Sequence, residues 1–320
     1  MSLGEMSWNI PLWFDIWLAG MAGGAYLVTF LADRYSGGAN KNIFRLAVYT
    51  GVPLAIIGVL LLVIDLGTPI WFWHLFANFS PVAVMSMGTW ILMAFLIIAF
   101  IMMVLWVVEG DVTRSADAYS SNMAGITRKG SNFLAWINLI FAILLITYPG
   151  VLLASTSQPI WSNTYLVPAL FVASAAATGV ALIILMAMLM NIVNNSSSSM
   201  LNSTVKWLFG STDWQISKET MDQLSKSLLG VIIVEVLLLI VYIIWLGVTG
   251  TSGSEALSLL TTGTLAIPFW IVIVGIGLII PLVLLLMNRA KATLIVTTSA
   301  SCVLLGGLAL RAIMIVGGQL

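Results

Sequence analysis

The sequence predicts an all-α integral membrane protein with eight transmembrane helices. Hydrophobic residues make up 61% of its 320 positions and charged residues only 8%, and the mean hydropathy is +1.10. Soluble globular domains carry about a quarter charged residues, so this composition excludes a soluble globule. Eight separate stretches also reach the roughly 20 mostly apolar residues that a helix needs to cross a bilayer.

The apolar stretches and the turns between them give the expected helices. Glycine pairs, asparagines and serines lie between several of the stretches, and these residues are typical of turns and helix ends. We expect membrane-spanning helices at residues 10–32, 47–70, 83–108, 133–155, 164–190, 228–248, 264–287 and 292–316.

One long connection, residues 191–227, divides the helices into four and four. This division predicts two four-helix bundles. Residues 1–190 would form the first bundle and the fifth helix, with a candidate ligand site within residues 1–160. Residues 228–320 would supply helices six to eight and complete the second bundle.

Small residues gather on two of the expected helices. The first helix contains AGMAGGAY (19–26) and the fifth contains ASAAATGVA (173–181). Side chains of this size let helix backbones approach closely in a membrane, so we expect both stretches to pack against neighbouring helices.

The distribution of Lys and Arg predicts the orientation in the membrane. Eleven of the twelve lie in the loops that follow odd-numbered helices, and the exception, Arg311, lies inside the eighth helix. Basic residues near helix ends stay on the cytoplasmic side. We therefore expect a multi-pass protein of the cell membrane with both termini outside and a cytoplasmic loop at residues 191–227. The eleven residues are Arg34, Lys41, Arg45, Arg114, Arg128, Lys129, Lys206, Lys218, Lys226, Arg289 and Lys291.

Composition also excludes several classes of function. The formal net charge is zero and the basic residues are scattered, so a nucleic-acid partner is not expected. The single cysteine, Cys302, supplies neither a disulfide nor iron–sulfur ligation, and the single histidine, His74, cannot make the axial pair of a membrane haem. No metal motif occurs. The first apolar run follows an acid and no basic residue, which predicts a retained helix instead of a cleavable signal peptide.

A small set of polar residues is expected at one depth near the outer face. Polar side chains inside a bilayer are costly, so each of them is a functional candidate. Asp65 and His74 lie close together in the tryptophan-rich stretch 64–90. In the predicted topology, this outer layer contains Asp15, Asp65, His74, Tyr148, Gln158 and Arg311.

Several of these residues have both a structural and a functional interpretation. Asp65 would pair with a cation such as Arg311, accept a proton from a redox substrate, or do both. His74 is either an interface histidine or a proton-transfer group for a bound ligand. Trp71 and Trp73 belong either to the aromatic belt of the membrane interface or to the rim of an apolar ligand pocket.

Two further acids are candidates for a proton path. Glu235 lies about two turns into the sixth expected helix, where it is either a paired structural acid or a proton relay. Asp15, on the first helix, is the second candidate for such a path.

Several motifs of the chain resemble those of a known family. IDLGTPIWFWHLF (64–76), followed by FSPVAVMSMGTW (79–90), is similar to the "LDLGRP...FWHL...SPMSWGSW" signature of the polysulfide-reductase membrane subunit family, of NrfD or PsrC type. Thr68 stands where the family commonly has arginine. Further similar stretches are YPGVLLASTSQPIW (148–161), FVASAAATGVAL (171–182) and LRAIMIVGGQ (310–319).

The resemblance implies a membrane anchor that oxidises or reduces a quinone or quinol and has no haem or iron–sulfur cluster of its own. Such subunits exchange electrons with a ferredoxin-like [4Fe–4S] subunit on the outer face and through it with a molybdenum or tungsten bis-pterin catalytic subunit.

By motif position, the catalytic candidates are Asp65, His74 and Tyr148. Trp71, Trp73, Gln158 and Arg311 are further candidates for contacts with the quinone. A proton-translocating role is a further expectation. The alternatives are a secondary transporter and a passive membrane anchor without a quinone site.

Overall fold

The computed structural model describes residues 10–38, 40–65, 69–74, 84–114, 118–156, 158, 160–161, 164–194, 218–287 and 293–320. This part of the chain is helical and contains no strand. Its elements are α1 (Ile10–Tyr35), α2 (Lys41–Asp65), the short 3-10 helix η1 (Pro69–Trp71), α4 (Val84–Arg114), α5 (Ala118–Ala154), α6 (Leu166–Asn194), α8 (Lys218–Val248), α9 (Thr251–Thr261), the π-helix η2 (Pro268–Ile279), α10 (Ile280–Leu286) and α11 (Thr293–Gly317).

Eight helical segments of the described residues are long and apolar enough to cross a membrane, which confirms the predicted number. Several of them are longer than expected. α5 begins at Ala118 instead of residue 133, and α8 begins at Lys218 instead of residue 228. The 37 residues of α5 extend over about 55 Å, well beyond the roughly 30 Å of a bilayer's hydrocarbon layer. Hydropathy identifies only the part of a helix that lies in that layer.

Three glycines with positive φ mark breaks between helices. Gly37 and Gly38 follow α1 with φ of 65° and 92°, and Gly250 separates α8 from α9 with φ of 88°. Glycine adopts this left-handed region without the steric penalty of a side chain. The turn at Gly37 and Gly38 is confirmed, whereas residues 251–253, expected in the turn after the sixth helix, form the first turn of the additional helix α9.

The seventh span combines two kinds of helix. It begins as the twelve-residue π-helix η2, whose end is marked by a hydrogen bond from the Ile280 N–H to the Gly275 carbonyl, and it continues as α10. Pro281 lies in the first turn of α10, where its missing N–H is best tolerated. The sequence predicted one regular helix here, because hydropathy depends on composition and not on the hydrogen-bond register.

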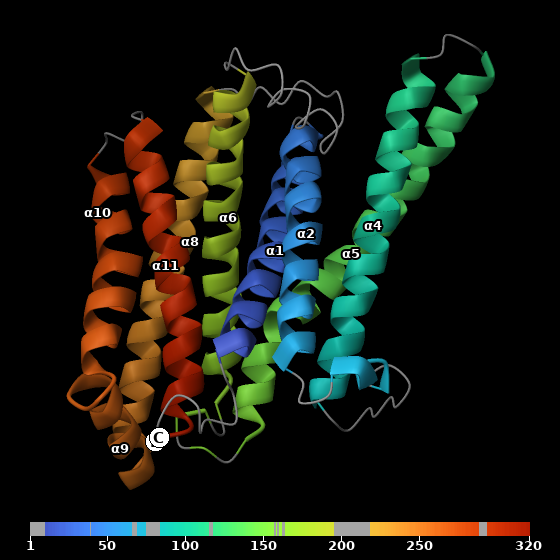
Figure 1. The fold of residues 1–320 in the computed structure, drawn as a ribbon. Coiled ribbons are helices and arrows are strands. Elements are labelled where there is room, and N and C mark those ends of the chain that lie inside the picture. Colours follow the sequence, from blue (N-terminus) through green and yellow to red (C-terminus); the bar gives the residue numbers. More distant parts are fainter. Residues whose placement is uncertain are drawn as a thin grey trace.

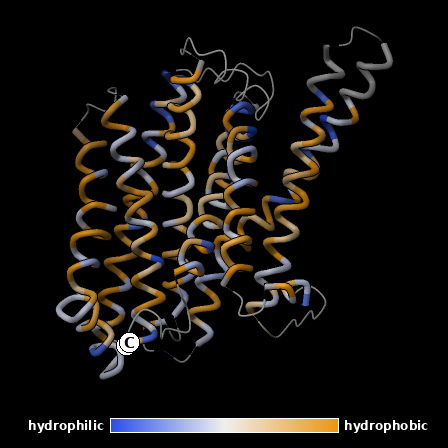
Figure 2. The backbone as a smooth tube through the Cα atoms, in the orientation of Figure 1, coloured by the Kyte–Doolittle hydropathy of each residue, from blue (hydrophilic) through white to orange (hydrophobic). Residues whose placement is uncertain are grey.

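The spanning helices run side by side, and α1 lies in the middle of the assembly (Figure 1). α1 packs against α2, α5, α6 and α11. α4 and α5 form a pair that leans away from α1 and α2 at one end (Figure 1). Apolar residues cover most of the length of the helices, and hydrophilic residues lie mainly toward their ends (Figure 2).

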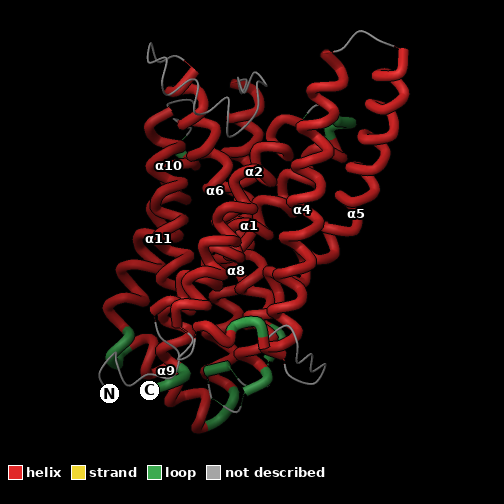
Figure 3. The backbone as a smooth tube through the Cα atoms, turned by 45° about the vertical axis from the view of Figure 1, so that its right-hand side comes forward, coloured by secondary structure: helices red, strands yellow, loops and turns green. Residues whose placement is uncertain are grey.

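The two ends of the molecule differ in charge. α1 begins at Ile10 at the same end as the C-terminus (Figures 1 and 3). We call this the terminal end. The last turn of α1 contains Arg34, and the next helix starts at Lys41, so these cations lie at the opposite end, which we call the basic end.

α1 and α6 are in direct backbone contact through the predicted small residues. A Cβ atom on Gly24 would overlap the carbonyl of Ala175, and one on Gly179 would overlap the backbone of Gly24 and Ala25. Only glycine permits this approach, and the expected packing role of both small-residue stretches is confirmed.

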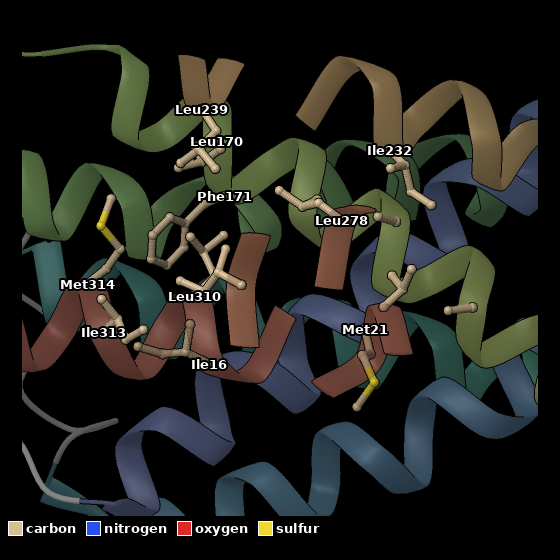
Figure 4. Packing of buried hydrophobic residues seen from close by; sticks show 14 of the residues in the cluster. Ile16, Met21, Leu170, Phe171, Ile232, Leu239, Leu278, Leu310, Ile313 and Met314 are labelled. Carbon is tan, nitrogen blue, oxygen red and sulfur yellow. The ribbon is translucent and has the colours of Figure 1, made fainter. Parts of the chain in front are cut away.

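Two clusters of buried apolar side chains form the core. One is built mainly by α1, α6, α8, η2 and α11, and the other mainly by α1, α2, α4 and α5. Figure 4 shows part of the first cluster, where Phe171 of α6 packs with Leu310 of α11 and Ile16 of α1. Because α1 contributes to both clusters, the division into two bundles and the domain limits stay predictions.

Candidate functional site

Asp15 is a buried carboxyl group near the terminal end of α1. It is 1% exposed and lies about 7.5 Å along the helix from Ile10. Among the described residues its Oδ1 atom has no hydrogen-bond partner, and Gly58 of α2 lies directly against it, since a Cβ there would be 2.7 Å from Oδ1. A buried carboxyl oxygen without a partner is costly, so this position favours a proton or a hydrogen-bond donor from a ligand.

Tyr148 is a second polar side chain near the terminal end. It comes from α5 at a similar depth, about 9 Å from Ala154, and is close enough to the Asp15 carboxyl to interact with it electrostatically. Its ring packs on Gly88 of α4, where a side chain would overlap it. We call these two residues the Asp15–Tyr148 pair; each of them packs against a glycine of a neighbouring helix.

His74 is held between two tryptophans after η1. Its ring stacks on Trp73 at a centroid distance of 3.7 Å and on Trp71 at 5.0 Å. Nδ1 lies 3.2 Å from the Trp71 carbonyl oxygen, which can only accept, so the imidazole donates from Nδ1 and leaves Nε2 free when neutral. Trp71 and Trp73 are about half exposed, so this aromatic cluster faces outward.

The described residues show no contact of Asp65 or Gln158 with the Asp15–Tyr148 pair. Asp65 is the last residue of α2, and its side chain lies outside the described part of the structure. Gln158 is exposed. The adjoining residues are anchored to the second half of the chain, because the Trp161 indole donates to the Met314 carbonyl at 2.6 Å and the Tyr242 hydroxyl donates to the Ile160 carbonyl at 2.8 Å.

The Arg311 side chain points away from the terminal end. Side chains on a helix slant toward its N-terminus, and α11 begins at the basic end. The guanidinium, 1% exposed, accordingly reaches back one turn, where Nη1 donates to the Gly307 carbonyl at 2.7 Å and to Ser174 Oγ at 3.3 Å. It also lies 5.8 Å from the ring centre of Phe171 and against Gly20 of α1.

Glu235 joins Arg311 through Ser174. The Glu235 carboxyl, 6% exposed, accepts a hydrogen bond from the Ser174 hydroxyl and interacts electrostatically with Arg311. One serine of α6 therefore bridges an acid of α8 and a base of α11. We call these three residues the Arg311–Ser174–Glu235 cluster. Pairing of Arg311 with Asp65 stays a prediction, because the Asp65 side chain is not described.

Sequence reasoning missed several of these groups. Ser174 lies within a small-residue stretch that was interpreted only as a packing surface, although a hydroxyl there could have signalled a partner for Glu235. The indole N–H groups of Trp13 and Trp17 on α1 are buried and have no hydrogen-bond partner within the part of the chain that the structure describes. Nothing in the sequence indicates that Gly58 and Gly88 pack against Asp15 and Tyr148.

The residues near the terminal end support proton and hydrogen-bond chemistry. A phenol and indole N–H groups can hold carbonyl oxygens, and a carboxyl and an imidazole can exchange protons. Within the described residues, no group of three or more His, Cys, Asp or Glu side chains could hold a metal ion.

Comparison with known proteins identifies the family. A model described as "Polysulphide reductase, NrfD" matches residues 2–320. Protein NrfD of Escherichia coli is 26% identical over 99% of this chain and 96% of its own length. The C subunit of the polysulfide reductase of Wolinella succinogenes is 28% identical over 98% and 94%, and the NrfD homolog of Haemophilus influenzae is 26% identical over 87% and 83%. The family match over nearly the whole chain, with its eight apolar helices, shows that this multi-pass membrane protein belongs to the polysulphide reductase NrfD family.

Proposed function

We propose that this protein is the quinone-reactive membrane subunit of a respiratory oxidoreductase complex. Its family is consistent with the membrane anchor of such a complex. The observation that carries the proposal is the Asp15–Tyr148 pair, in which a buried carboxyl oxygen that has no hydrogen-bond partner among the described residues belongs to a side chain that interacts electrostatically with a phenol.

The pair suits the chemistry of a quinol. Oxidation of a quinol to a quinone releases two electrons and two protons. The Tyr148 hydroxyl would donate a hydrogen bond to one ring oxygen, and Asp15 would accept the two quinol protons one after the other, releasing the first before the second arrives. His74 would pass protons to the aqueous side through Nε2, with Trp71 and Trp73 at the rim of the ligand site. Asp65, Gln158 and Arg311 remain further candidates for ligand contacts.

The partners follow from the same proposal. The relative from Wolinella succinogenes is named as the C subunit of a polysulfide reductase, and such a name implies other subunits. A ferredoxin-like [4Fe–4S] subunit would bind at the terminal end. It would take the two electrons and exchange them with a molybdopterin catalytic subunit. The basic end would face the cytoplasm, and both termini would lie outside the cell membrane.

Proton translocation is a second candidate, favoured by the Arg311–Ser174–Glu235 cluster. Glu235 lies about 20 Å along α8 from Val248, so its carboxyl is well inside the apolar layer. Buried acids in such positions belong to proton relays in many pumps and transporters. Asp15, nearer the terminal end, would be the exit of this path.

The proposal is tested on the intact complex in liposomes, with quinol-coupled turnover measured beside dye reduction by the peripheral subunits. Asp15→Asn should lower quinol-coupled turnover by about a hundredfold or more, because it removes the proton acceptor, while dye reduction is retained. Glu255→Gln is the control, since Glu255 is an exposed acid of α9, the helix that follows α8 at the same end of the molecule (Figure 1).

A second pair of variants tests the phenol. Tyr148→Phe should lower quinol-coupled turnover by about two- to tenfold through loss of one hydrogen bond. Tyr242→Phe is the control, because its hydroxyl is committed to Ile160. Normal quinol-coupled turnover in both Asp15→Asn and Tyr148→Phe would refute the assigned site. Substrate flux in liposomes that contain this chain alone would instead identify a transporter, and absence of quinone-site inhibitor binding would identify a passive anchor.

A further inference from the structure

A cavity of 360 Å³ lies at the basic end, between the α1–α2 pair and the α4–α5 pair. It is located where α4 and α5 lean away from α1 and α2 (Figures 1 and 3). The Asp15–Tyr148 pair lies toward the opposite end of α1, so the quinone chemistry proposed above does not account for this cavity.

Cationic and aromatic side chains line the cavity. Arg34, Lys41 and Arg128 line it, together with the aromatic side chains of Phe44 and Trp106. A fourth cation, Arg45, interacts with Lys41 and with the Trp106 ring.

Two carboxylates balance only part of this charge. Glu109 binds both Lys41, at 3.4 Å, and Arg45. Asp33 lines the cavity beside Arg34 and Lys41. Among the described charged residues that line the cavity, the three cations Arg34, Lys41 and Arg128 exceed the one carboxylate, Asp33, by two charges. Lys41 is repelled by both Arg45 and Arg128, and an anion in the cavity would relieve that repulsion.

Two side chains of the cavity wall have polar atoms that form no hydrogen bond with another described residue. Arg34 is fixed in place, because Nη2 donates to Asn132 Oδ1 at 3.2 Å and the guanidinium lies 5.0 Å from the ring centre of Phe30. Among the described residues, its Nε–H and the Oδ1 atom of Asp33 are buried without a hydrogen-bond partner. A guanidinium is a donor that suits a phosphate, and a carboxylate is an acceptor that suits a hydroxyl.

An apolar stripe continues from the cavity along the outside of α5. Phe133, Trp136 and Ile140 lie on one face of the helix and are 67%, 54% and 59% exposed. Trp136 also lies 5.6 Å from the Arg34 guanidinium. A ligand with a charged headgroup and long apolar chains would match the cavity and the stripe together.

We propose that this cavity binds the headgroup of an anionic phospholipid from the leaflet at the basic end. Arg34, Lys41 and Arg128 bind the phosphodiester, Asp33 accepts a hydrogen bond from a headgroup hydroxyl, and the acyl chains lie along Phe133, Trp136 and Ile140. Basic pockets between transmembrane helices are established sites for such headgroups. The bound lipid would connect the α4–α5 pair to α1 and α2.

The test measures lipid bound per chain on the full complex in mild detergent, by native mass spectrometry and lipid extraction. Arg128→Ala removes a cation that lines the cavity and is exposed, so the fold should be retained. Lys129→Ala is the matched control, because Lys129 is the exposed neighbour and does not line the cavity. Arg128→Ala should weaken binding of phosphatidylglycerol about fivefold and leave phosphatidylcholine unchanged, whereas Lys129→Ala should change neither.

A second variant and a second ligand complete the test. Lys41→Gln should produce a loss similar to that of Arg128→Ala. The proposal would be overturned if Arg128→Ala bound both lipids as tightly as the unsubstituted protein does. It would also be overturned if Lys129→Ala lost as much phosphatidylglycerol binding as Arg128→Ala. Thermal stabilisation of the delipidated complex should occur with phosphatidylglycerol and not with inorganic phosphate. Stabilisation by inorganic phosphate alone would identify a soluble anion as the occupant and overturn the lipid assignment.

Discussion

Arg311→Met should be among the most destabilising substitutions in the chain, and Glu235→Gln should partly rescue it. The Arg311 guanidinium is 1% exposed and makes two hydrogen bonds, to Ser174 and Gly307. Hydrogen bonds of a charged group contribute about 1.5–3 kcal/mol each, so their loss corresponds to about 3–6 kcal/mol.

The rescue follows from the charge that the first substitution leaves behind. Without Arg311, the Glu235 carboxylate stays buried and, among the described residues, accepts from the Ser174 hydroxyl. Glu235→Gln removes that charge, so the double variant should be more stable than the sum of the single changes by about 2 kcal/mol.

Thermal unfolding of the purified complex, followed by tryptophan fluorescence in a fixed detergent, measures these differences. Arg311→Met should lower the apparent midpoint by about 10 °C. Lys129→Met, at an exposed position of the basic end, should leave it nearly unchanged. Additive effects of Arg311→Met and Glu235→Gln would show that the two side chains do not interact, and the interpretation of the cluster would then be wrong.

Two further predictions concern helix packing and protons. Gly179→Ala should destabilise the protein by about 1–3 kcal/mol, because its methyl group would overlap α1, whereas Gly230→Ala, with no atom within 4 Å, should be neutral or slightly stabilising in the same unfolding assay. Glu235→Gln should lower the number of protons released per two electrons in vesicles, and the exposed Glu255→Gln should not. An unchanged ratio in Glu235→Gln would remove this residue from the proton path.

The fold was largely predictable because its main determinants are local in the sequence. Apolar runs specify spanning helices, and the paired glycines Gly37 and Gly38 specify a turn. The polar first turns of α5 and α8 were not predictable from hydropathy, since they extend beyond the layer that hydropathy detects. The π-helical register of η2 was not predictable for a different reason, because nothing in the composition distinguishes it from an α-helix.

The candidate site was predictable in its residue types but not in its pairings. The buried acids Asp15 and Glu235 stood out because such groups are rare in apolar helices. Their neighbours depend on how helices distant in the sequence rotate and pack. Asp15 and Tyr148 pack against glycines of α2 and α4, and a serine of α6 forms hydrogen bonds with both Glu235 and Arg311.

The glycine contact between α1 and α6 has a mechanical consequence. Backbones that touch at Gly24 and Gly179 leave α1 little freedom to slide along its axis. The same helix carries Asp15 on one side. About 7.5 Å further along, Gly20 lies against the Arg311 guanidinium on the other side of the helix. We expect α1 to behave as a rigid rod, so that a displacement at either polar site is transmitted to the other without a chain of intervening hydrogen bonds.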